Sequence, residues 1–188
     1  MTELLSRRMN KKIEFQFNKQ KAIEAILYFA NVRKEQKLTV LHLLKFLYYA
    51  DMYHLNKYDR PVLGDCYYAM ENGPVASNVY DLLKKSCNDY ELNGWGKDSK
   101  VTPLREANLE YFSETDIEAF DYVLTTYKHK TPDEMVKETH NTKAWINAWN
   151  NKSYFAKRSE MKYEDFYVND IPTEKLEYLK TYSSLMVF

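Results

Sequence analysis

The side chains of this sequence that could carry out chemistry are few and dispersed. Its four histidines are His42, His54, His129 and His140, and none lies in an HExxH, CxxCH or paired CxxC pattern. Asp51 and His54 are three positions apart, a spacing that places a carboxylate and an imidazole on one face of a helix. A di-metal bundle needs several such pairs. We therefore expect no metal site and no cofactor, and expect Asp51 to accept a hydrogen bond or to orient His54.

Nucleophilic and phosphate-binding motifs are absent from the sequence. Cys66 and Cys87 have 20 residues between them and no CxxC pair, which is typical of buried thiols in a reducing compartment. No GxSxG elbow, Walker A loop or GxGxxG turn occurs, and four glycines in total leave little material for a phosphate-binding loop. The sequence therefore predicts a protein that is not an enzyme.

The charge balance argues against a general polyanion partner. Lys and Arg number 27 and Asp and Glu number 27, so the formal net charge is zero. Short basic clusters at Lys84–Lys85, Lys128–Lys130 and Lys157–Arg158 are typical of solvated helix ends. We therefore do not expect nucleic acid as the main partner. A DNA-binding transcriptional regulator with a helix-turn-helix-like element is kept as the alternative function.

Apolar stretches are too short for a membrane span, because the longest, 26–30 and 46–50, have five residues each. The first 19 residues lack a continuous hydrophobic region and a small-residue cleavage site, so we expect a cytoplasmic protein with no membrane partner.

Helical periodicity dominates the chain, which has only four glycines and five prolines as turn formers. Apolar residues at helical spacing over 23–30 predict one helix, and Thr39 is a plausible N-cap for a second, nearly all-apolar helix that we expect at the centre. Similar signals predict helices that begin at Pro74 or Ser77, near Ser113, at Thr131, before Trp145 and at Thr173.

Extended structure is expected at only a few places. Residues 67–70 suit a short strand, with which 101–104 and 110–112 could pair, while 88–100 is predicted as a surface loop. The predicted fold class is mainly α: a compact helical domain with a small β-hairpin or short β-sheet patch.

The chain divides into three predicted parts. Residues 1–17 form an N-terminal arm with Arg7, Arg8, Lys11 and Lys12, residues 18–150 form the helical domain, and 151–188 form a C-terminal extension packed on that domain. The core is expected to begin near Asn18.

The segment 67–75 combines the strongest local constraints. Tyr67, Tyr68 and Met70 precede a glycine that can take a positive φ, and Pro74 follows it. Two interpretations are open: a strand-to-helix corner with half-buried tyrosines, or an aromatic surface that binds a partner. Because side chains alternate along a strand, only one of the two tyrosines can face a partner.

Two blocks of the sequence resemble the Panacea domain, the SocA-like antitoxin family. The first is LHLLKFLYYADMYHLNKYDRPVLGDCYYAMENGPVASNVYDLL at 41–83, and the second is TPDEMVKETHNTKAWINAW at 131–149. The second block is similar to the family's Ser/Thr-His-x4-Trp element, here Thr139, His140 and Trp145. The resemblance extends over about residues 20–150.

The resemblance implies an antitoxin of a toxin-antitoxin system, from a bacterial or prophage locus, that neutralises a cognate toxin protein by direct binding. Some relatives act as proteolytic adaptors for a ClpXP-type protease, and the sequence leaves both modes open. His140 and Trp145 either contact the toxin or lock two helices together. The predicted partner-binding residues are Tyr67, Tyr68, Met70, Glu71, Asn72, Gly73, Pro74, Val75, His140 and Trp145.

Overall fold

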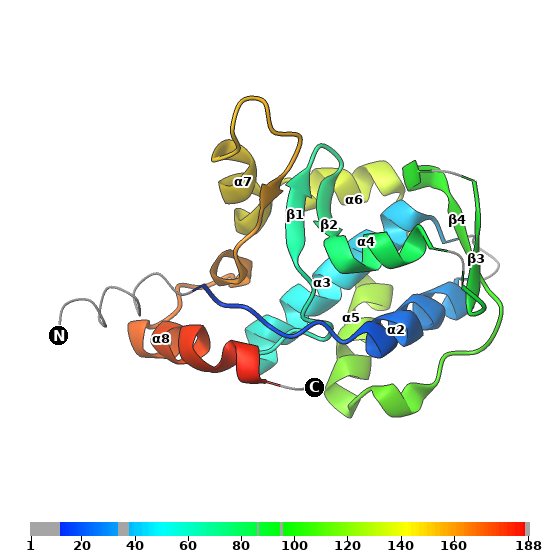
Figure 1. Ribbon diagram of the computed structural model, residues 1–188, viewed down its shortest axis with the longest axis horizontal. Helices are drawn as coiled ribbons and strands as arrows, with labels where there is room; N and C mark the ends of the chain where they lie inside the picture. Colours follow the sequence, from blue (N-terminus) through cyan, green and yellow to red (C-terminus); the bar gives the residue numbers. More distant parts are fainter. Residues whose placement is uncertain (1–11, 34–37, 86, 95, 187–188) are drawn as a thin grey trace.

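Helix α3 (Val40–Tyr58) runs through the middle of the computed structural model, which describes residues 12–33, 38–85, 87–94 and 96–186 (Figure 1). The Thr39 hydroxyl accepts a hydrogen bond from the backbone N–H of His42 and caps the helix, as the sequence predicts. Most of the side chains of α3 are buried, because apolar residues occupy nearly every face of it.

Helices α2 (Lys19–Val32) and α5 (Glu114–Tyr127) pack against α3. The rings of Phe29, Phe46 and Phe120 meet where the three helices come together, with Phe29 centroids 5.4 Å from Phe46 and 5.0 Å from Phe120. The other α-helices among the described residues are α4 (Ser77–Leu83), α6 (Pro132–Thr139), α7 (Lys143–Asn150) and α8 (Thr173–Tyr182). Ser113 and Thr131 form the capping boxes that begin α5 and α6, which confirms both predicted starts.

Two small antiparallel sheets complete the fold, which is therefore mainly α with a small sheet patch, as predicted. One sheet has the strand order β2 (Gly73–Ala76), β1 (Tyr67–Met70), β5 (Ser159–Glu160). The other pairs β3 (Tyr90–Asn93) with β4 (Lys100–Pro103), at the end of the molecule away from α8 in Figure 1.

The structure corrects three expectations about strands. The predicted loop 88–100 contains β3, and 101–104 pairs with β3 rather than with 67–70. The N–H of Val101 donates to the carbonyl of Leu38, so the other side of β4 faces the start of α3. Residues 109–111 form a 3-10 turn, and the tail supplies the second partner of β1, with Ala69 opposite Ser159.

Both ends of the described chain contribute to the core. Ile13 and Phe15 are buried, and the Phe15 ring meets the Tyr163 ring edge-on at 4.9 Å, so the core begins before the predicted position near Asn18. Of the basic residues predicted in the arm, Lys12 pairs with Glu160 at 2.8 Å, while Arg7, Arg8 and Lys11 lie outside the described residues. In the tail, Phe166 and Leu179 are buried.

Asp51 connects α3 to the chain that leads into β1. One carboxylate oxygen accepts the backbone N–H groups of Val62 and Leu63, both at 2.9 Å, and the other accepts the Tyr67 hydroxyl at 2.9 Å. Burial raises the pKa of Asp51 to about 7, against the effect of these donors. Two roles were open for Asp51, and in the structure it accepts hydrogen bonds rather than orienting His54. His54 instead contacts the Arg60 carbonyl at 2.7 Å and the Thr115 hydroxyl at 3.0 Å.

We expect Asp51→Ala to lower the free energy of unfolding by about 2–4 kcal/mol, because it leaves two buried backbone N–H groups without an acceptor. Urea unfolding followed by circular dichroism measures this change. The matched control is Asp81→Ala, which removes an exposed carboxylate that pairs with Lys84 and should change stability very little. Similar losses in the two variants would contradict this role of Asp51.

Candidate partner-binding site

The β1–β2 hairpin and the α6–α7 turn form one junction with α3 and α7, which we term the hairpin corner. It consists of residues 67–76, Lys45, Thr139, His140, Trp145 and Trp149. The indole N–H of Trp145 donates to the Met70 carbonyl at 3.0 Å. The ring of His140 stacks on Trp145 with centroids 3.9 Å apart, and Trp145 stacks in turn on Trp149 at 5.1 Å. The structure therefore brings together residues from both of the sequence blocks singled out above.

Gly73 allows the hairpin to lie directly on α3 and α6. Its φ is +86°, and a Cβ at this position would lie 2.5 Å from the Thr139 hydroxyl oxygen and 2.8 Å from Lys45 Nζ. Both the backbone conformation and the space therefore require glycine. Together with Trp145, this close approach fixes the hairpin against the helices.

Lys45 is a buried amine in the middle of α3 that the sequence analysis did not select. Its side chain has no exposed surface, and Nζ donates to the Pro74 carbonyl at 2.7 Å. Burial lowers the pKa of Lys45 to about 7. The available signal was a single lysine within the otherwise nearly apolar run 40–50, since a charged residue in a helix with no polar face needs a buried acceptor.

His140 lies next to this amine. Burial lowers the pKa of His140, and the charge of Lys45 lowers it further, while a hydrogen bond to the Glu71 backbone opposes the shift. Its Nε2 atom is buried and has no hydrogen-bond partner within the described part of the chain. His140 thus joins the hairpin to α6 and α7, which is the contact expected if it locks two helices together.

The predicted partner-binding residues divide by exposure. Tyr67 is only 1% exposed, so it cannot contact a partner in this conformation, and its hydroxyl bonds to Asp51. Its ring packs against Tyr48 at 5.7 Å and Phe166 at 5.3 Å, so the prediction is corrected: this tyrosine belongs to the core. Gly73 and Pro74 are also buried, Glu71 and Asn72 are exposed, and the partly exposed residues are Tyr68, Met70, Val75, His140 and Trp145.

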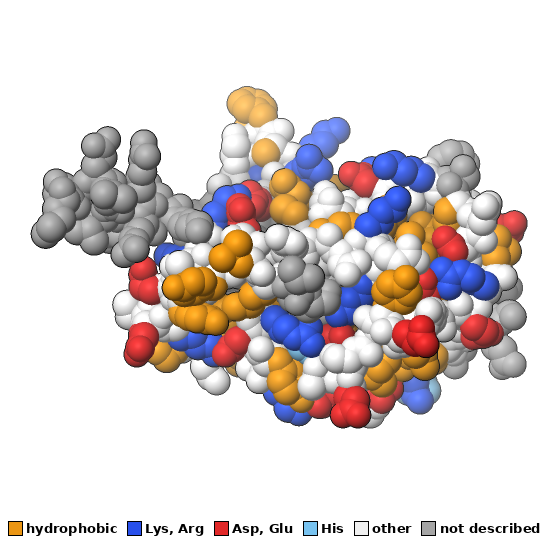
Figure 2. All heavy atoms as spheres, turned by 60° about the horizontal axis from the view of Figure 1, so that its bottom comes forward, with side chains coloured by type: hydrophobic (Ala, Val, Ile, Leu, Met, Phe, Trp, Pro, Cys, Tyr) orange, Lys and Arg blue, Asp and Glu red, His pale blue; other side chains and the backbone are white. Residues whose placement is uncertain are grey.

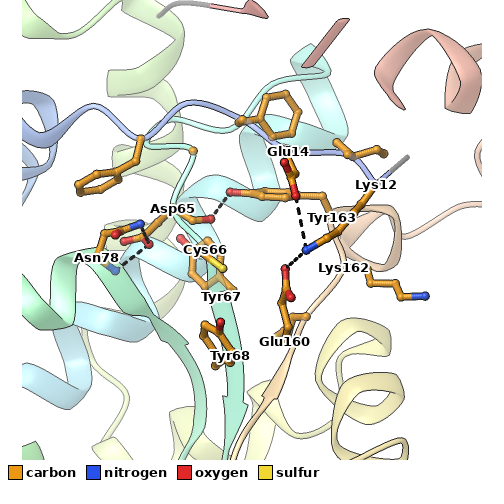
Figure 3. Close-up of a pocket in the computed structure, with 15 residues that line it drawn as sticks. Lys12, Glu14, Asp65, Cys66, Tyr67, Tyr68, Asn78, Glu160, Lys162 and Tyr163 are labelled. Atoms are coloured by element: carbon orange, nitrogen blue, oxygen red, sulfur yellow. Dashed lines mark hydrogen bonds and ion pairs between the residues drawn. The ribbon is translucent and has the colours of Figure 1, made fainter. Parts of the chain in front are cut away.

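A groove of about 570 Å³ borders β1 on the side of the N-terminal segment and β5 (Figure 3). Four of its charged groups have partners: the Asp65 carboxylate accepts the backbone N–H groups of Asn78 and Val79, and Lys12 lies between Glu14 and Glu160. Burial raises the pKa of the Cys66 thiol, which disfavours its nucleophilic thiolate form.

Within residues 12–33, 38–85, 87–94 and 96–186, no three His, Cys, Asp or Glu side chains are grouped so as to hold a metal ion. Over the same residues, no helix has both the length and the apolar character needed to cross a membrane.

Comparison with known proteins identifies the class of this protein. Residues 43–146, more than half of the chain, match the model of the family described as Antitoxin SocA-like, Panacea domain. The chain belongs to this family, as the sequence resemblance implies. The match includes Lys45, Gly73, His140 and Trp145, and thus the whole hairpin corner apart from Trp149. No curated protein and no solved structure matches the chain.

Gly73→Ala should lower the free energy of unfolding by about 2–4 kcal/mol, because it adds a steric clash to the cost of a positive φ. Gly96→Ala is the matched control: Gly96 also has a positive φ, of +76°, but a Cβ there would meet no atom within 4 Å. Thermal and urea unfolding of both variants should show the larger loss for Gly73→Ala. Equal losses would mean that backbone strain alone explains the requirement for glycine.

Lys45 should make stability rise with pH above 7. Its pKa falls from 10.5 to about 7 on folding, so between these values the unfolded chain binds the extra proton and alkali favours the folded state. The expected slope is at most about 1.4 kcal/mol per pH unit. Lys45→Met removes this titration, so the difference in unfolding free energy, wild type minus variant, should increase from pH 7 to 9. Parallel pH profiles would contradict the assignment.

Proposed function

We propose that this protein is an antitoxin that neutralises a cognate protein toxin by direct binding. The observation that carries the proposal is the family match over residues 43–146, which includes almost all of the hairpin corner. The proposal includes a cytoplasmic location and a gene in a bacterial or prophage toxin-antitoxin locus, as the family resemblance implies.

The use of the buried charged groups favours a binding role over catalysis. Asp51, Asp65 and Asp116 each accept hydrogen bonds from backbone N–H groups, and Asp116 also pairs with Lys21 at 2.8 Å and Arg60 at 3.2 Å. These carboxylates stabilise connections between elements. We therefore propose that the protein acts without a reaction of its own.

The hairpin corner has the properties of a protein-binding surface. Tyr68, Met70 and Trp145 are partly exposed beside the exposed Glu71 and Asn72, so aromatic and polar contacts lie next to one another. The Trp145 hydrogen bond and the glycine-dependent packing hold this surface in place, so the protein itself would lose little conformational entropy when a partner binds.

Co-expression with the products of the adjacent genes tests the proposal. We expect the protein to restore growth to cells that express one of them as a toxin, and to co-purify with that toxin. Tyr68→Ala should weaken this binding about tenfold with nearly unchanged thermal unfolding, because the tyrosine is outside the core. The control is Tyr111→Ala, which removes a tyrosine that is 43% exposed and lies outside the hairpin corner. The proposal would be overturned if the protein rescued growth from none of the adjacent gene products and bound none of them.

The same cells separate neutralisation from proteolytic delivery. Under direct neutralisation, the toxin persists as a stable complex, and rescue is retained in cells that lack a ClpXP-type protease. Under delivery, the antitoxin shortens the half-life of the toxin, and rescue is lost without the protease.

The DNA-binding alternative makes a different prediction. A transcriptional regulator would retard a fragment of its own promoter in a salt-sensitive manner. The absence of a shift at low salt would exclude this alternative and leave the proposed antitoxin role unaffected.

A further inference from the structure

Two aromatic side chains stand at the tip of a loop between α7 and β5, which we term the aromatic loop (residues 151–158). Tyr154 and Phe155 are each 90% exposed, more than any other large hydrophobic residue described. In Figure 1 this loop extends beyond the rest of the body, and Figure 2 shows hydrophobic atoms at the same edge. Water therefore surrounds two large rings that make no contribution to the core.

The loop has a defined turn at its tip. The N–H of Ala156 donates to the Ser153 carbonyl at 2.9 Å, so Tyr154 and Phe155 are the central residues of a closed turn. Glycine, proline, asparagine and aspartate are the usual residues at such positions, because their backbones or short side chains favour turns. Two aromatic residues there give the turn no such advantage, but they provide a large contact area for a partner.

The ends of the loop are attached to the hairpin corner. On one side Ser159 pairs with Ala69 of β1, and on the other the N–H of Lys152 donates to the Trp149 carbonyl at 3.3 Å. The Arg158 guanidinium lies 4.5 Å from the centre of the Tyr68 ring, and Lys152 Nζ lies 4.9 Å from that of Trp149. The aromatic loop therefore continues the candidate partner-binding site outward.

The charge around the loop is one-sided although the whole protein is neutral. Residues 139–159 contain Lys143, Lys152, Lys157 and Arg158 but no Asp or Glu. Among the described residues, Lys152, Lys157 and Arg158 form no ion pair, and the nearby carboxylate of Glu160 is paired with Lys12. Basic residues that flank two exposed rings along the chain complement a surface with carboxylates around an apolar pocket.

We propose that the aromatic loop is the contact that selects the toxin, by inserting Tyr154 and Phe155 into an apolar pocket rimmed by Asp and Glu side chains of the toxin. This inference rests on the proposed antitoxin function. The loop lies outside the family match, which ends at residue 146, so the family match does not assign this contact. A recognition loop on a rigid body can set partner specificity without altering the fold that carries it.

The test uses the full chain and the adjacent gene product that the wild type neutralises. Tyr154→Ser with Phe155→Ser should weaken the measured Kd by about 100-fold and abolish growth rescue, with unchanged thermal unfolding. The matched control is Tyr178→Ser with Tyr182→Ser on α8, which removes two touching aromatic rings that are 55% and 48% exposed. This control should bind the toxin as the wild type does.

Charge reversal tests the acidic rim separately. Lys152→Glu with Lys157→Glu should slow association with the toxin at least tenfold at low salt, and the difference from wild type should shrink as salt increases. If the charge-reversal variant associated with the toxin as fast as the wild type does, the proposal that acidic side chains surround the pocket would be overturned.

The outcomes distinguish this inference from the proposed function. If the wild type rescues growth and binds the toxin, and the serine variant does so equally well, the aromatic loop is not the contact although the antitoxin role stands. If the wild type binds no adjacent gene product, both fail. The wild type and the loop variant are also tested for binding to single-stranded oligo-dT and to phosphatidylserine vesicles. If the wild type binds one of these probes and the loop variant does not, while the variant keeps toxin binding, the inference is overturned in favour of nucleic acid or a lipid surface.

Discussion

The candidate site depends on the hydrogen bonds that the buried carboxylate of Asp51 accepts. By accepting hydrogen bonds from two consecutive backbone N–H groups and from Tyr67, it fixes how the chain leaves α3 and how β1 approaches it. Once the Tyr67 side chain points inward, alternation along the strand directs Tyr68 outward. One buried acceptor thus determines which tyrosine is available to a partner, because a strand shifted by one residue would exchange the two faces.

The hairpin corner has a polar centre within an apolar body. A buried amine at Lys45 is costly to desolvate, and its bond to the Pro74 carbonyl offsets only part of that cost. A buried polar contact of this kind favours one arrangement of hairpin and helices over others that would leave the amine without an acceptor. This preference is consistent with a protein that binds through a preformed surface, since such a surface requires one defined geometry.

The molecule combines a family domain with a C-terminal tail that adds a strand to its sheet. Residues 43–146 belong to the SocA-like antitoxin family and include α3 and the β1–β2 hairpin, whereas the tail supplies β5 and the loop that leads into it. Because β5 adds to the free edge of β1, the loop is anchored by backbone hydrogen bonds to the strand that carries Tyr68. A tail attached in this way can place new contacts beside an existing surface without changing the core.

The sequence by itself determined the features that depend on neighbouring residues. Examples are the capping boxes at Ser113 and Thr131 and the apolar stripe of α2. They depend on residues within one or two helical turns, so they can be predicted from the sequence without knowledge of the fold. Only the tertiary structure decided that Tyr67 faces the core, that Lys45 meets Pro74 and that residues 159–160, rather than 101–104, pair with β1. Strand alternation shows that two faces exist but not which is inward, and pairing between distant segments depends on packing that no local pattern records.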